Sequence, residues 1–119
     1  MKFSSKIIAG RGVGRQLGFP TLNLEIPENF KVEEGVYAAR LFLAERSFPA
    51  ILFFGNRRTF DGVKSLEIHV LVEFSESPAT AEFEVLQKIR EVNKFDSEKK
   101  LREQVEKDCE TAREILGVR

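Results

Sequence analysis

The sequence predicts an all-β fold with a C-terminal α-helix: a small, six-stranded, antiparallel closed barrel with the helix packed on it. Strand and turn signals fill residues 1–88, helical periodicity runs from residue 96 to the end, and 119 residues suit one hydrophobic core. Closing the sheet would remove the exposed edges that an open sheet has to protect. We therefore expect a single domain over residues 1–119, with the barrel at about 1–93 and the helix at about 96–116.

The first two predicted strands flank a glycine-rich loop. Residues 3–9 form the first strand, and residues 20–26 alternate apolar and polar side chains until Pro27 ends the pattern. Thr21 and Asn23 therefore share one face of the second strand, opposite its leucines. The loop between the two strands holds four of the eight glycines of the chain, Gly10, Gly12, Gly14 and Gly18.

The next four strands follow from apolar runs and alternation. Residues 35–44 and 47–55 are strongly apolar, and Glu45-Arg46 between them is expected to form a hairpin turn. Residues 64–74 alternate, with Glu67 and His69 on the polar face. Residues 80–86 alternate in the same way and complete the six strands.

The last element is an amphipathic helix. Asp96 and Ser97 are candidates for its N-cap, and Gly117 is a typical residue just beyond a helix C-terminus. The mixed charges of residues 97–114 are expected to form a solvated face. Apolar side chains recur at steps of three and four along the other face: Leu101, Val105, Cys109, Ala112, Ile115 and Leu116.

Composition excludes several classes of protein. Hydrophobic residues make up 42% of the chain and charged residues 32%, and 19 basic residues balance 19 acidic ones. Disorder needs lower hydrophobicity or a large net charge. Binding to nucleic acid through its phosphates needs a basic excess, which this chain lacks, so we expect no nucleic-acid partner. Eleven phenylalanines supply material for the core, because phenyl rings pack without a polar group to satisfy.

Cysteine usage and the N-terminus indicate the cellular compartment. The single cysteine, Cys109, excludes an intrachain disulfide and a cysteine-based zinc site, and it suits a reducing compartment. The apolar run at the N-terminus, residues 7–9, is too short for the core of a signal peptide. No run approaches the ~20 apolar residues of a membrane span. We therefore expect a cytoplasmic protein without a membrane partner.

The glycine-rich loop is a candidate phosphate site. It is not a P-loop, because no Gly-Lys-Ser/Thr follows, and it is not a dinucleotide fingerprint, because Pro20 and a strand follow it. Glycines let backbone N–H groups approach an anion, and Arg11 and Arg15 add positive charge. A loop with solvated arginines is the alternative, and spacing alone favours that alternative.

Three polar side chains on the strands are candidates for metal binding and catalysis. Thr21 and Asn23 offer a hydroxyl and an amide oxygen side by side, which are suitable ligands for Mg²⁺. Glu67 is a candidate general base toward an alcohol. The commoner explanation of all three is a polar face turned to solvent. His69 is a weaker candidate for a second catalytic group, since a histidine between apolar neighbours is more often packed or exposed.

Together these motifs resemble riboflavin kinases. Residues 12–24, GVGRQLGFPTLNL, are similar to the family signature, in which a loop rich in glycine and arginine runs into Leu-Gly-(Phe/Tyr)-Pro-Thr-x-Asn. Further matches follow in the family's order: Gly35-Val36-Tyr37-Ala38, Leu66-Glu67-Ile68-His69, Ile89-Arg90 and Lys94-Phe95. The resemblance therefore covers nearly the whole chain. It implies a six-stranded antiparallel barrel with a C-terminal helix.

The resemblance also implies a reaction and its residues. The family transfers the γ-phosphate of Mg-ATP to riboflavin, which gives FMN and ADP. Thr21 and Asn23 would bind magnesium and the nucleotide, Glu67 would accept the proton of the ribityl 5′-hydroxyl, and Arg90 would lie near the flavin. The loop would cover the nucleotide phosphates, with the further binding residues Gly10, Arg11, Gly12, Gly14, Arg15, Gly18 and Pro20. We expect a monomer whose partners are these small molecules.

Two departures from the family pattern keep an alternative open. Residues 53–60 and 75–80 differ from the turns that often follow the fourth strand and the glutamate strand in the family. The alternative is a flavin- or nucleotide-binding barrel with weak or no turnover. A barrel that binds nucleic acid through Arg57 and Arg58 is a third hypothesis, which the zero net charge disfavours. Many bacterial relatives also carry an FMN adenylyltransferase domain, which these residues do not include. We therefore expect FMN and not FAD as the product, from either a stand-alone kinase or a fragment of a longer protein.

Overall fold

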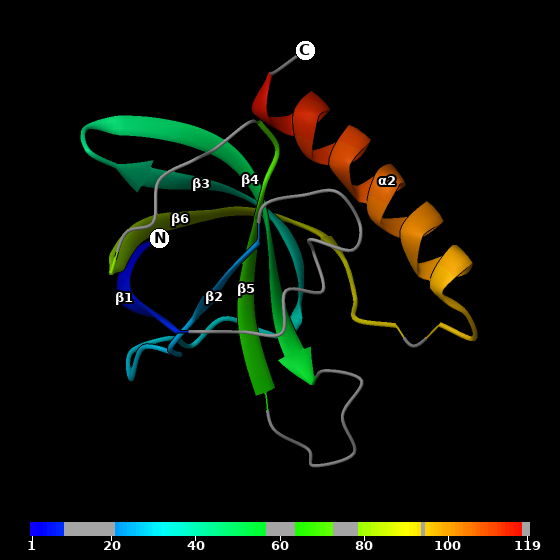
Figure 1. Cartoon of the computed structure of the whole chain (residues 1–119), viewed down its shortest axis with the longest axis horizontal. Coiled ribbons are helices and arrows are strands. Elements are labelled where there is room, and N and C mark those ends of the chain that lie inside the picture. Colours follow the sequence, from blue (N-terminus) through cyan, green and yellow to red (C-terminus); the bar gives the residue numbers. More distant parts are fainter. Residues whose placement is uncertain (9–20, 57–63, 73–78, 94, 118–119) are drawn as a thin grey trace.

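The computed structural model describes residues 1–8, 21–56, 64–72, 79–93 and 95–117 of the chain (Figure 1). Six strands and one helix follow one another: β1 (Lys2–Ile8), β2 (Thr21–Leu24), β3 (Gly35–Leu43), β4 (Arg46–Asn56), β5 (Lys64–Val70), β6 (Thr80–Arg90) and α2 (Glu98–Leu116). The strands close into a barrel in the order β1-β2-β5-β4-β3-β6. Every neighbouring pair of strands is antiparallel. The predicted fold class is confirmed.

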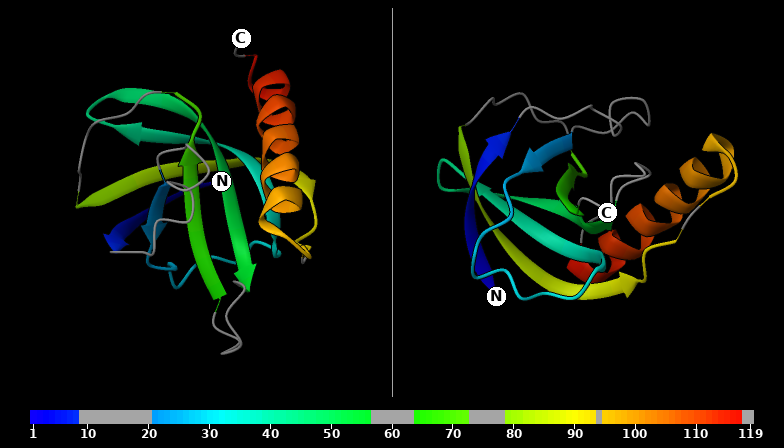
Figure 2. Two further views of the ribbon diagram at one scale, coloured as in Figure 1. Left: turned by 45° about the vertical axis from the view of Figure 1, so that its right-hand side comes forward. Right: turned by 90° about the horizontal axis from the view of Figure 1, so that it is seen from below.

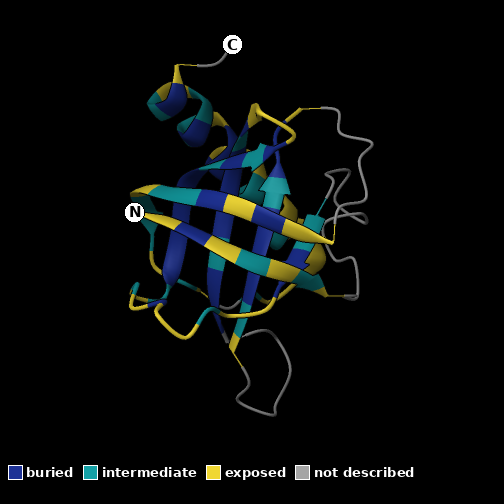
Figure 3. Cartoon of the chain, turned by 90° about the vertical axis from the view of Figure 1, so that its left-hand side faces the viewer, coloured by how far each residue is buried: buried dark blue, intermediate teal, exposed yellow. Residues whose placement is uncertain are grey.

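The inside of the barrel holds the main core. Alternate residues of each strand point inward, as the succession of buried and exposed positions along β1 and β6 shows in Figure 3. Phe30, from the segment between β2 and β3, lies at the centre of an aromatic cluster. Its ring centroid is 4.8 Å from that of Phe3 and 4.8 Å from that of Phe54, both edge-on. Five phenylalanines of the described residues lie in this core, in line with what the number of phenylalanines led us to expect: Phe3, Phe30, Phe48, Phe54 and Phe83.

A second apolar cluster joins α2 to the outside of the barrel. The helix lies along one side of the barrel (Figure 2), against the outer face of β3, β4 and β6. Its buried residues Cys109, Ala112 and Leu116 pack with Val36 and Ile51 of the sheet. The helix-forming signals act as predicted. The Ser97 hydroxyl accepts the backbone N–H of Lys100 at the N-cap, and Gly117 follows the last turn in the left-handed conformation, with φ +68°.

Several predictions of local structure were wrong. Two strands end earlier than expected, β2 at Leu24 instead of residue 26 and β5 at Val70 instead of residue 74. The hairpin turn lies at Ala44-Glu45, not at Glu45-Arg46, because Arg46 already pairs with Leu43. Both turn residues have positive φ, 49° and 65°, as a two-residue hairpin turn that follows the twist of the strands requires. The last strand continues past residue 86 to Arg90. Its pairing with β3 contains two register shifts, and these bulges break the alternation that would have revealed the extension.

The predicted outer charged face of the helix also needs a correction. Asp108 belongs to the segment that we expected to be solvated, yet it is only 3% exposed. It lies where α2 meets the end of β6 and accepts an arginine there, as described below. No helix within the described ranges is both long enough and apolar enough to cross a membrane.

Candidate functional site

The candidate site lies on the outer face of two paired strands, β2 and β5. Their antiparallel register sets Thr21 opposite His69 and Asn23 opposite Glu67. The residues between them, Leu22 and Ile68, are turned to the core. Four polar side chains that are far apart in the sequence therefore form a two-by-two arrangement on one face of the barrel. The sequence predicted three of the four as site residues, and the structure brings those three together.

Two members of this group are buried despite their polarity. Asn23 is 8% exposed and Glu67 is 6% exposed, and in the described part of the chain only Asp108 joins them as a buried polar or charged residue. Burying an amide or a carboxylate opposes folding unless partners compensate. The outer face of β1 shows the ordinary arrangement, with exposed Lys2, Ser4 and Lys6. The β2–β5 face is therefore exceptional within this barrel.

A direct contact joins Thr21 and His69, one of the two cross-strand pairs. The hydroxyl oxygen Oγ1 of Thr21 lies 3.2 Å from Nδ1 of His69. Both side chains are half-buried. The contact fixes the threonine side chain relative to β5, the strand that also carries Glu67.

The donor set on this face fits Mg²⁺. Within the residues described, no group of three or more histidine, cysteine, aspartate or glutamate side chains could hold a metal ion. The face instead offers the Thr21 hydroxyl and the Asn23 amide oxygen, with the Glu67 carboxylate opposite Asn23. Magnesium accepts a few such oxygen ligands and completes its octahedron with waters and phosphate oxygens. Thr21 and Asn23 are therefore suitable magnesium ligands.

An apolar strip leads from Glu67 across the sheet. Phe53 of β4 lies opposite Glu67, Val36 of β3 lies opposite Phe53, and Arg90 of β6 lies opposite Val36. Strands are ~4.8 Å apart, so Arg90 is roughly 14 Å from Glu67 along this row. Phe53 is partly buried and packs with the α2 cluster. The carboxylate therefore has an aromatic surface on one side and the Asn23 amide on the other.

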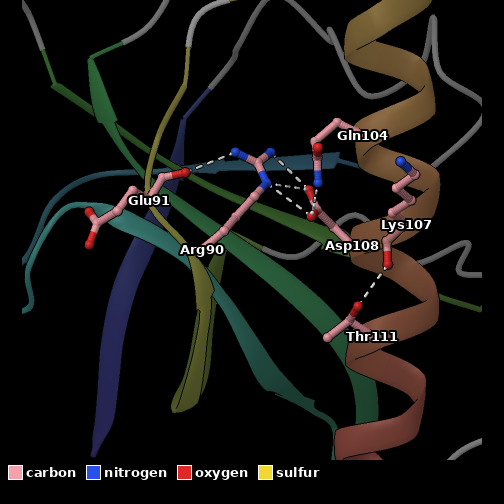
Figure 4. Close-up of polar contacts among 6 residues, drawn as sticks. All are labelled: Arg90, Glu91, Gln104, Lys107, Asp108 and Thr111. Atoms are coloured by element: carbon pink, nitrogen blue, oxygen red, sulfur yellow. Dashed lines mark hydrogen bonds and ion pairs between the residues drawn. The ribbon is translucent and has the colours of Figure 1, made fainter.

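Arg90 is held by the helix (Figure 4). Its Nε donates to both carboxylate oxygens of Asp108, at 2.9 and 3.0 Å, and its Nη2 donates to Oδ2 at 2.8 Å. Gln104 donates to Asp108 Oδ1 at 3.0 Å, and Arg90 Nη1 donates to the carbonyl of Glu91 at 3.0 Å. The guanidinium also lies over the ring of Phe95, 5.7 Å from its centroid. Arg90 thus connects β6 to α2, and its proposed contact with a flavin stays a prediction.

Sequence reasoning missed Ser65. It lies two residues before Glu67 on the same face of β5, and among described side chains its Oγ is the one buried polar atom without a hydrogen-bond partner. A serine in an alternating strand looks like an ordinary solvent-facing residue, so no signal in the sequence distinguishes it. His69 was weighed only as a catalytic group, because the register that sets it opposite Thr21 is not visible in one strand alone.

Several predicted site residues lie outside the described residues. They are the loop residues Gly10, Arg11, Gly12, Gly14, Arg15, Gly18 and Pro20. The arginines of the third hypothesis, Arg57 and Arg58, and most of the divergent turn at residues 75–80 also lie outside them.

Comparison with known proteins supplies the family. The profile of the riboflavin kinase (flavokinase) family matches residues 1–116. The chain is 37% identical over 116 residues to the bifunctional riboflavin kinase/FMN adenylyltransferase of Haemophilus influenzae, covering 94% of this chain and 37% of that protein. It is 32% identical over 118 residues to the Escherichia coli K12 protein of the same name, covering 97% and 38%. The chain thus spans less than two fifths of the length of these curated relatives.

Solved structures agree on the barrel. A riboflavin kinase from Trypanosoma brucei superposes with a TM-score of 0.65 at 20% identity, over 98% of this chain and 79% of that one, which shows the shared fold. A Streptococcus pneumoniae structure described as a macrolide-efflux protein gives a TM-score of 0.81 at 28% identity, over 94% of this chain and 38% of that one.

The closed barrel with its external helix is the fold of a riboflavin kinase domain. With the match over residues 1–116, this chain belongs to the riboflavin kinase (flavokinase) family.

Proposed function

We propose that this domain transfers the γ-phosphoryl group of ATP to the ribityl 5′-hydroxyl of riboflavin, giving FMN and ADP, with Mg²⁺ as cofactor. The observation that carries the proposal is the pairing of buried Asn23 with buried Glu67, beside Thr21, on two adjacent strands. Membership of the riboflavin kinase family supports the choice of substrates. The glycine-rich loop before Thr21 would cover the nucleotide phosphates.

Glu67 would act as the general base. The ribityl 5′-hydroxyl oxygen attacks the γ-phosphorus, the bond from phosphorus to the β,γ-bridging oxygen breaks, and ADP departs with that oxygen. The hydroxyl proton passes to the Glu67 carboxylate. Mg²⁺, held by Thr21 and Asn23, would neutralise phosphate charge. Phosphoryl transfer needs positioning and charge neutralisation more than covalent help, so these residues and backbone donors can suffice.

The surroundings of Glu67 suit a flat substrate. Phe53 lies opposite Glu67 on β4 and extends the apolar surface toward α2. A flavin with its ribityl end at Glu67 could place its ring against half-buried Phe53, since Val36 beyond it is covered by α2. Since the three proposed reactive residues come from one barrel, a monomer would contain the complete set. We propose the cytoplasm, where ATP is abundant, as its location.

A discontinuous assay tests the proposal. The protein is incubated with riboflavin, ATP and Mg²⁺, and flavins are separated by chromatography. We expect FMN from the wild-type protein and almost none from Glu67→Gln, whose amide cannot accept the proton. The absence of FMN with ATP, CTP and GTP alike, together with retained flavin binding, would favour a binding module instead.

A further inference from the structure

His69 lies beside a proposed magnesium ligand, although nothing in the proposed reaction requires it. We propose that His69 is a positioning residue. Its ring accepts a hydrogen bond from the Thr21 hydroxyl and so directs the Thr21 oxygen toward the bound cation. The proposal rests on the proposed function, because it takes Thr21 as a magnesium ligand.

The contact has the geometry of a hydrogen bond. Thr21 Oγ1 and His69 Nδ1 are 3.2 Å apart, and the two residues are direct cross-strand partners. A hydroxyl that binds a cation does so through an oxygen lone pair, so its proton has to point elsewhere. Nδ1 of neutral imidazole is an acceptor when the proton is on Nε2. The threonine hydroxyl then donates to His69 and can offer an oxygen lone pair to the metal.

The fold holds His69 in place before any ligand arrives. Its neighbours in β5, Ile68 and Val70, are fully buried inside the barrel. On the other side, His69 is opposite Ile51 of β4, which belongs to the cluster beneath α2. The imidazole therefore extends from a strand that is anchored on both faces. Residues that orient a metal ligand are effective when packing fixes their own position.

Each proposed metal ligand on β2 has its own cross-strand partner on β5. Asn23 has the proposed base, Glu67, as its partner, and Thr21 has His69. Both partners come from one strand, two residues apart and on the same face. Metal ligands on β2 are thus each matched by a residue on β5, so a shift of one strand relative to the other would disturb the metal and the base together.

Two conservative variants separate this role from a merely structural one. In His69→Asn the side-chain amide reaches the position of Nδ1 and still presents an acceptor. In His69→Gln the amide reaches the position of Nε2 instead and leaves Thr21 without that acceptor. Both variants remove the imidazole, so a loss common to both reports packing, whereas a difference between them reports the hydrogen bond.

The readout is the binding of ADP, measured by titration calorimetry with Mg²⁺ and with a chelator in its place. We expect His69→Gln to lower the Mg²⁺-dependent gain in ADP affinity by about 10- to 100-fold, the range for outer residues that orient metal ligands. ADP affinity in chelator should not change, and His69→Asn should retain most of the gain. In a Thr21→Val background, His69→Gln should have no further effect, because the residue it positions is gone.

The outcomes separate the two proposals. If the wild-type protein gains no ADP affinity from Mg²⁺, the proposed metal site falls, and the role of His69 falls with it. If the wild-type protein shows the gain and His69→Gln matches it, only the positioning role is overturned. Equal losses in Asn and Gln variants, or a loss that persists with Thr21→Val, would likewise contradict a role through the threonine hydroxyl.

Discussion

Two buried carboxylates distinguish the two sides of this barrel. Asp108 is 3% exposed and Glu67 is 6% exposed. Asp108, at the helix, receives a bidentate arginine and a glutamine. Glu67, on β5, has an amide and a phenyl ring as its cross-strand neighbours. Similar burial thus goes with different surroundings: a cation of the fold neutralises Asp108, whereas we propose that Glu67 accepts a proton from a substrate hydroxyl.

The largest effect should come from Glu67→Gln. If Glu67 is the general base, the variant lowers kcat by roughly 10²- to 10⁴-fold, because the proton of the attacking hydroxyl loses its acceptor. Initial rates of FMN formation measure this, and equilibrium titration should find riboflavin and ATP binding retained. Near-normal turnover in the variant would remove Glu67 from the mechanism, and the two buried carboxylates would then not differ in function as proposed.

The opposite profile is expected for Asp108→Ala. Removing this carboxylate leaves the Arg90 guanidinium without its ion pair in a largely buried position, and the loss should lower the free energy of unfolding by roughly 3–5 kcal/mol. Urea denaturation followed by circular dichroism measures it. The double variant Arg90→Met/Asp108→Leu, which replaces the pair by apolar side chains, is the control and should recover most of the loss.

The same double variant tests whether Arg90 contacts the flavin. A contact between Arg90 and the flavin, as the family resemblance implies, predicts a raised KM for riboflavin and an unchanged KM for ATP. Steady-state kinetics on the folded double variant measures the KM for riboflavin and the KM for ATP. An unchanged KM for riboflavin would leave Arg90 as an anchor of α2 only.

A smaller change is expected at the proposed metal ligands. Thr21→Ala and Asn23→Ala each remove one oxygen donor, so the Mg²⁺ concentration needed for half-maximal rate should rise by about 10-fold or more. Titrating Mg²⁺ at saturating ATP and riboflavin checks this. Ser4→Ala, on the solvent-exposed outer face of β1, serves as the control. A wild-type magnesium titration in both site variants would contradict their assignment as ligands.

The smallest effect concerns Cys109, the neighbour of Asp108 on α2. Burial raises the pKa of its thiol to about 11 from the usual 9.0. The unfolded chain therefore loses this proton at lower pH than the folded one, so the thiol's contribution to stability is complete below pH 9 and declines as pH rises from 9 to 11. Urea unfolding across this range, with Cys109→Ala as reference, isolates the contribution. Iodoacetamide at pH 8 should label the unfolded protein much faster than the folded one.

The sequence predicted the two strands of the site but not that they pair with each other. Alternation assigned Thr21, Asn23 and Glu67 to polar faces, and the structure confirms that they lie opposite their strands' core-facing side chains. That β2 pairs with β5, and that Asn23 is opposite Glu67, depends on barrel closure, which no local pattern encodes. The burial of Asp108 was missed for a similar reason. Its partner Arg90 lies in the part of β6 where bulges break the alternation, so the sequence did not predict this part as strand. Asp108, beside the apolar stripe of the helix, was therefore expected to be solvated.

The seam between the first and last strands has a consequence for how the chain is made. The N-terminal ammonium donates to the carbonyl of Val85, 84 positions later, and β1 pairs along β6. During synthesis on the ribosome, β1 can pair with β2 early, but its other edge has to wait until β6 has emerged. Folds dominated by such distant pairings close in milliseconds to seconds, not in microseconds. Until β6 emerges, the nascent chain therefore exposes two unpaired edges, those of β1 and β3, and its need for chaperones should be greatest there.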